Sequence, residues 1–110
     1  MSTTSDMEFI EGSGNVFADL GLPDAEKALA KAELAHTISA AIAGRNLVES
    51  QAAELLGVDQ PELSALLRGR LSGFSIDRLL QFLLALDRDV EIVIKPHAGS
   101  RGQVRVVAVS

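Results

Sequence analysis

The most constraining feature of this sequence is a pair of short helix-forming segments separated by a single glycine. The first segment covers residues 49–56, and its inward-facing apolar residues are predicted to be Ala52, Ala53, Leu55 and Leu56. Gly57 follows directly, and glycine accepts the left-handed backbone conformation that a sharp turn between two helices needs. Ala53 is small, as close approach of the two helices requires. The pattern therefore predicts two helices that meet at an angle.

The second segment carries its own start and stop signals. Asp59 with Glu62 three residues later is a capping-box pattern, and Pro61 falls in the first turn, where its missing N–H costs nothing. The helix is predicted to run to about Arg68 and to stop at Gly69. We expect the Glu62 carboxylate to be held against its own backbone by this capping role.

Longer helical patterns flank this pair. A helix is predicted to start at Asp24, after Pro23, and to run to Ala43, with Gly44 as its C-cap. Its apolar face is made by Leu34, Ile38, Ala41 and Ile42. Ser75 can cap a further helix over residues 76–86, which is apolar nearly all round. Such a helix is covered on more than one side, so a subunit interface or a sheet is expected against it.

The periodicity changes near the C-terminus. Val90, Ile92 and Ile94 alternate with polar residues, and so do Val104 and Val106. This alternation predicts two strands, over residues 90–95 and 103–109, that pair either within one chain or across a dimer. The predicted fold is thus mainly α, a bundle of four to five helices with a short C-terminal β segment of two strands.

The charge of the 110-residue chain is unevenly distributed. Its net charge is −5, yet residues 1–26 contain six acidic residues and no basic one. Residues 27–110 contain nine acidic and ten basic residues and are close to neutral, which permits DNA binding. We therefore predict a mobile acidic arm over residues 1–22, a DNA-binding domain over 23–88, and a C-terminal β segment over 89–110 that serves dimerisation.

No residue pattern indicates catalysis or a cofactor. The chain contains no cysteine, and its two histidines, His36 and His97, lie far apart without metal-ligand spacing. There is neither a signal-peptide pattern nor an apolar stretch near the ~20 residues that cross a bilayer. We expect a non-enzymatic cytoplasmic protein with no cofactor, no metal and no membrane association.

The two short helices supply the candidate DNA contacts. Leu66 and Leu67 are expected to hold the second helix on the core, which leaves its other side free. Glutamine can pair with an adenine edge, serine can reach a base or a phosphate, and arginine suits phosphates. Arg45 is expected either to contact phosphate or to be solvated, and Arg78 and Arg88 to be plain surface charges. The candidate DNA-binding residues are Gln60, Pro61, Ser64, Ala65, Arg68, Arg70, Arg45 and Gln51.

Over residues 31–86 this pattern resembles the Cro/C1-type (XRE) helix-turn-helix family, whose members bind DNA. A narrower resemblance, to HigA-type antitoxins, is carried by residues 14–22, 59–70, 71–75 and 89–96. It implies an antitoxin that neutralises a RelE/ParE-like ribonuclease toxin and represses their shared operon. A homodimer is expected from the residues themselves, because the helix over 76–86 is too apolar for one covered face and the two predicted strands leave edges that invite pairing. A two-fold dimer would bind a palindromic operator.

The sequence departs from the family pattern at the start of the first short helix. Relatives place Thr and Gln there, whereas this chain has Val48 and Glu49. Glu62 stands where related sequences often carry a basic residue.

The sequence leaves three functional hypotheses: an antitoxin and autorepressor, a free-standing regulator without a toxin, and an interaction module that has lost DNA binding. Residues 14–22 separate the first two, because they either pack on the domain or bind a partner.

Overall fold

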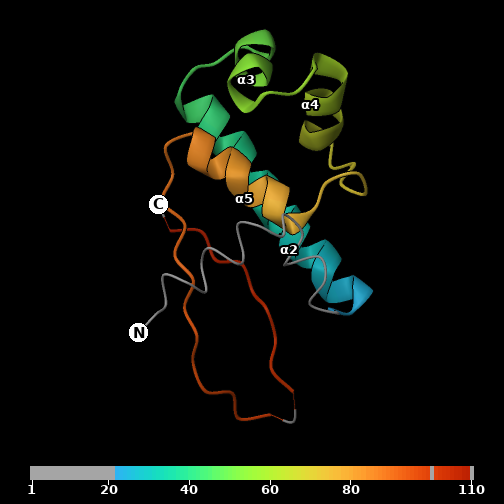
Figure 1. The fold of residues 1–110 in the computed structure, drawn as a ribbon, viewed down its shortest axis with the longest axis vertical. Coiled ribbons are helices and arrows are strands. Elements are labelled where there is room, and N and C mark those ends of the chain that lie inside the picture. The colour runs from blue at the N-terminus through green and yellow to red at the C-terminus, as the bar shows by residue number, and fades with distance from the viewer. Residues whose placement is uncertain (1–21, 100, 110) are drawn as a thin grey trace.

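The computed structural model of the chain describes residues 22–99 and 101–109 (Figure 1). Four helices occur in this part of the chain, and they are α2 (Asp24–Gly44), α3 (Glu49–Leu56), α4 (Gln60–Leu67) and α5 (Ile76–Ala85). The prediction of a mainly helical protein is confirmed. The predicted acidic arm, residues 1–22, lies outside the described residues except for Leu22.

The centre of the fold is the packing of α2 against α5, which run diagonally across Figure 1. Ile38 of α2 and Leu79 of α5 are fully buried. Each buried side chain of this size stabilises the fold by roughly 1.5–3 kcal/mol. Within the described residues the buried core is wholly apolar.

The short helices α3 and α4 pack on each other at one end of this pair, seen at the top of Figure 1. Leu63 and Leu66 of α4 are almost completely buried, and Ala52 and Ala53 of α3 are buried as well. Leu55, which was expected to face inward, is instead 41% exposed. The core thus fixes α3 and α4 as a projecting pair at the end of the long helices.

The end of α2 differs from the prediction. Gly44 is the last residue of the helix, and the left-handed conformation falls two residues later, at Asn46, with φ 57°. Asparagine is one of the few residues that adopts this conformation readily. Arg45 donates its backbone N–H to the helix, so the helical turn continues past the glycine.

The predicted C-terminal strands are not formed: residues 89–99 and 101–109 contain no strand. Figure 1 shows this segment running away from the helices and returning. Val90, Val104 and Val106 pack against the core, but Ile92 and Ile94 are 63% and 92% exposed. An isolated two-stranded ribbon is marginal in water, and nothing in the described chain covers Ile92 and Ile94.

Leu22, just before α2, belongs to the buried core, with 9% of its surface exposed, so it is a packing residue of the domain. Among the helices described here, none combines the length and apolar character that crossing a membrane requires.

Candidate nucleic-acid interface

The turn between α3 and α4 is built as the sequence predicts. Gly57 adopts a left-handed conformation with φ 74°, and its N–H donates to the carbonyl of Glu54 at 3.2 Å. Val58 donates to the carbonyl of Ala53 at 3.0 Å, which closes the end of α3. The chain then enters α4 within two residues, so the relative position of the two helices is determined by local hydrogen bonds.

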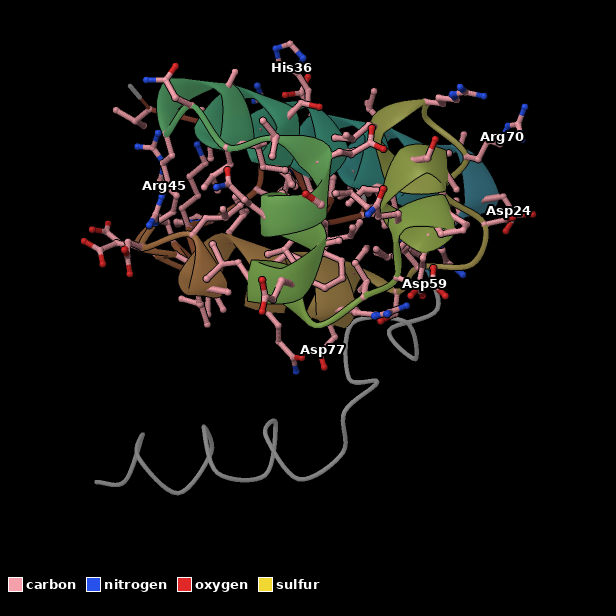
Figure 2. The ribbon with its side chains drawn as sticks, turned by 90° about the horizontal axis from the view of Figure 1, so that it is seen from above. Asp24, His36, Arg45, Asp59, Arg70 and Asp77 are labelled. Carbon is pink, nitrogen blue, oxygen red and sulfur yellow. The ribbon has the colours of Figure 1, made fainter. Side chains whose placement is uncertain are left out.

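The start of α4 is fixed by a side-chain cap. The Oδ1 atom of Asp59 accepts a hydrogen bond from the N–H of Glu62 at 2.8 Å, and Pro61 occupies the first turn. This satisfies one of the N–H groups that the first turn of a helix leaves without a partner. Figure 2, which looks onto this end of the molecule, shows Asp59 beside the start of α4.

The helix α4 has one buried side and one solvent-facing side. Leu63 and Leu66 anchor it to the core. At 100° per residue, the side opposite these two leucines is formed by Gln60, Pro61, Ser64, Ala65 and Arg68. Gln60, Pro61 and Arg68 are exposed, whereas Ser64 and Ala65 are half-buried. The structure therefore brings the predicted base-reading residues onto one face, where glutamine and serine can present donors and acceptors to a DNA groove.

The arginines at the end of α4 extend this face. Gly69 takes φ 83°, and the backbone N–H of Arg70 donates to the carbonyl of Ala65 at 2.9 Å, so the chain turns back over the helix end. Arg68 and Arg70 are both exposed, and Figure 2 shows Arg70 pointing away from the helices. Two exposed guanidinium groups beside a polar helix face suit contact with phosphates.

Arg45 forms an ion pair with Asp87, on the side of the α3–α4 pair opposite Arg70 (Figure 2). Its Nη1 atom lies 2.9 Å from Oδ2 of Asp87, which joins the turn after α2 to the turn after α5. In Figure 2, Arg45 and Arg70 appear on opposite sides of the α3–α4 pair. Arg45 is thus neither simply solvated nor part of the α4 face, although 40% of its side chain remains exposed.

Gln51 lies at the start of α3 and has a local role. Its Oε1 atom accepts a hydrogen bond from the N–H of Val48 at 3.0 Å. This bond is one half of a capping box, in which the side chain of the third helical residue accepts from the N–H of the residue before the helix. The other half, which a Thr at position 48 would make to the N–H of Gln51, cannot form because valine has no polar side-chain atom. The amide nitrogen of the exposed Gln51 side chain is the group that can donate to a phosphate.

Two expectations about charged residues are wrong. Glu62 does not turn back onto its own backbone, since its Oε2 atom lies 2.7 Å from Nη1 of Arg78. Arg78 is therefore not a plain surface charge. Its guanidinium carbon also lies 5.1 Å from the ring centre of Phe74 and 5.3 Å from that of Phe82. The sequence gives little signal for this contact, because the partners stand on different helices.

The described residues offer no group of three or more side chains that could hold a metal ion. His36 and His97 are both exposed. The exposed side chains of Gln60, Arg68 and Arg70 offer hydrogen-bond donors, an acceptor and positive charge, which are the groups used in nucleic-acid recognition.

Comparison with known proteins agrees with this geometry. Residues 16–95 match a family model described as a helix-turn-helix domain. None of the curated proteins searched matches the chain. One solved structure matches with a TM-score of 0.70 and 44% sequence identity, over 80% of this chain and 99% of the other. Its description assigns it provisionally to the XRE family of transcriptional regulators. This chain belongs to the helix-turn-helix proteins of the XRE family.

Proposed function

We propose that this chain is a transcriptional repressor that binds duplex DNA with α4 in the major groove. The observation that carries the proposal is the outward face of α4, where Gln60, Ser64 and Arg68 follow one another along the helix opposite the buried Leu63 and Leu66. A recognition helix needs such a face, because side chains there reach base edges while the other face holds the helix in place.

Each residue of this surface has a distinct proposed role. Gln60 and Ser64 read bases, and the exposed Arg68 and Arg70 bind phosphates, with Gln51 as a further phosphate donor. Pro61 and Ala65 offer apolar surface to the groove. Arg45 reaches a phosphate only if its ion pair with Asp87 opens. The Asp87 side chain is largely exposed.

Substitution of two of these residues tests the proposal on an operator selected from random duplexes. Gln60→Ala should cost about 1–3 kcal/mol of binding free energy and relax the preference at one base pair. Arg70→Ala should weaken binding to all sequences alike and reduce the salt dependence by about one unit. Unchanged operator binding after loss of both Arg68 and Arg70 would remove this assignment.

The repressor is further proposed to act as a homodimer on a palindromic operator. The exposed apolar side chains of the C-terminal segment support this, because Ile92, Ile94, Val107 and Val109 have no cover within the described chain. Their alternating pattern suits pairing with the same segment of a second copy, which would supply the missing strand partner.

A second candidate function is neutralisation of a ribonuclease toxin, with autoregulation of a shared operon. The six acidic residues and the absence of a basic residue in 1–26 favour it, since a toxin that binds RNA has a basic face. Val16, Phe17 and Leu20 would supply apolar contacts, whereas Leu22 is occupied in the core. A free-standing regulator needs no such partner and agrees equally with the family.

Truncation distinguishes these two functions. A chain that starts at Leu22 keeps the core residue and removes most of the acidic segment. If the segment binds a toxin, this chain should bind its operator normally and fail to rescue cells that express the toxin from the neighbouring gene. Full rescue would place the toxin on the helical body. The absence of a toxin-like neighbouring gene would favour the free-standing regulator.

A further inference from the structure

The ion pair between Glu62 and Arg78 joins the recognition helix to α5. The Nη1 atom of Arg78 lies 2.7 Å from Oε2 of Glu62, and each side chain is 35% exposed, so the pair is half-buried. The helix α4 packs mainly on α3 and α2, and α5 packs mainly on α2. The ion pair is thus a direct polar contact between α4 and α5, two helices that pack chiefly against α2 and α3 and little against each other.

Both partners are fixed on their own helices. The N–H of Glu62 donates to Asp59 at the start of α4, and the N–H of Arg78 donates to Oγ of Ser75 at 3.1 Å at the start of α5. Each residue therefore stands at the third position of a capped helix. The ion pair connects two first turns whose backbones are already held in place.

The Arg78 guanidinium is also held by aromatic rings. It lies within about 5 Å of the centres of Phe74 and Phe82, at 5.1 and 5.3 Å. These rings are buried, and they pack edge to face with their centres 6.1 Å apart. A planar guanidinium can stack on rings and bind a carboxylate at the same time, which an ammonium group does poorly. The position of Arg78 is therefore determined independently of Glu62.

We propose that Arg78, although outside the DNA-reading helix, is a positioning residue of the DNA interface that holds and neutralises the Glu62 carboxylate. The N-terminal residues of a recognition helix are those that approach DNA most closely. An unpaired carboxylate in that turn would repel phosphates, whereas one that is paired with Arg78 carries no net charge to the interface. This inference rests on the proposed DNA binding.

A double-mutant cycle on the full chain tests this role. Arg78→Met keeps an apolar stem over the rings and removes the charge, and Glu62→Gln removes the carboxylate at constant shape. The measurement is affinity for a mixed-sequence duplex by fluorescence anisotropy at low salt. Arg78→Met alone should weaken binding by about tenfold, and in the Glu62→Gln background by less than about twofold. Glu62→Gln alone should bind as tightly as the unsubstituted chain, or more tightly.

Two control variants remove the effect of net charge. Arg88→Met and Glu91→Gln change the charge equally at exposed positions beyond the end of α5. They should alter affinity by less than about twofold. Thermal melts of every variant ensure that binding is measured on folded protein. If Arg78→Met unfolds, Glu62→Gln still tests the inference, because weaker DNA binding by that variant than by the unsubstituted chain would contradict it.

The outcomes separate this inference from the proposed function. An equal loss from Arg78→Met in both backgrounds would mean that Arg78 acts without Glu62, and would overturn the inference. So would a loss no larger than that of Arg88→Met. Failure of the unsubstituted chain to bind any duplex would instead overturn DNA binding itself.

Discussion

Side-chain caps determine where α4 and α5 begin. The carboxylate of Asp59 and the hydroxyl of Ser75 each accept a hydrogen bond from the N–H three residues later, at 2.8 and 3.1 Å. Because a cap depends on neighbours in the sequence, the start of each helix is predictable from the residues alone. The cap at Asp59 also supports the helix that presents Gln60 and Ser64.

Loss of the Asp59 cap should destabilise the domain measurably. Asp59→Ala is expected to lower the free energy of unfolding by about 1 kcal/mol, because the N–H of Glu62 loses its acceptor. Urea denaturation measures the change. Asp89→Ala is the matched control, since Asp89 is exposed and caps none of the described helices. An equal effect of the two substitutions would contradict the capping role.

The partners of Glu62 and Arg45 could not be predicted in the same way. Arg45 pairs with Asp87, 42 residues away, and Glu62 pairs with Arg78 on another helix. Such contacts depend on how the helices pack, and a local pattern carries no information on that. The exposed face of α4 was predictable because its positions follow from helical spacing and the burial of two leucines.

Glycine has opposite roles in two elements of this fold. Gly57 takes φ 74° in the turn between α3 and α4, whereas Gly44 is the last residue of α2. A Cβ atom added at either position meets no atom within 4 Å. Any effect of adding a methyl group must therefore arise from the backbone and not from steric contact.

The two glycine positions should respond to alanine with opposite signs. Gly57→Ala is expected to cost about 1–2 kcal/mol, because a left-handed conformation is strained for alanine. Gly44→Ala should stabilise the chain by up to about 1 kcal/mol, because alanine favours the helix. Thermal unfolding of the two variants measures both changes. A destabilised Gly44→Ala variant would contradict this assignment of the helix end.

The C-terminal segment shows where element prediction from sequence stops. Alternation of Val90, Ile92 and Ile94 is a local signal for an extended chain, but a strand exists only when another strand pairs with it. In the described chain no partner does so, and Ile94 remains 92% exposed. By contrast, α3 begins and ends at the predicted residues, because helix hydrogen bonds form within the segment.

At the scale of the whole molecule, the proposed dimer would place two recognition helices on one DNA site. A two-fold arrangement with the helices ~34–36 Å apart matches one turn of duplex. One copy of α4 offers a small face, so two copies are expected to be needed for useful affinity. The exposed C-terminal side chains supply the surface proposed to join them.

Polar substitution of that surface should separate dimerisation from folding. The double variant Ile92→Ser/Ile94→Ser is expected to be monomeric where the unsubstituted chain is dimeric at micromolar concentration. The free energy of unfolding of the single chain should change by less than about 0.5 kcal/mol, because both side chains are already exposed. Analytical ultracentrifugation measures the first effect and thermal unfolding the second. A monomeric unsubstituted chain would contradict the proposed dimer.

The central claim is that α4 meets DNA with the face opposite Leu63 and Leu66. Nuclear magnetic resonance of the labelled chain, titrated with a selected duplex, tests it most directly. The account predicts that the largest backbone amide shifts fall on Gln60, Ser64, Arg68 and Arg70, with few in residues 89–99. Shifts concentrated in residues 89–99 and 101–109, with those of α4 unchanged, would contradict it.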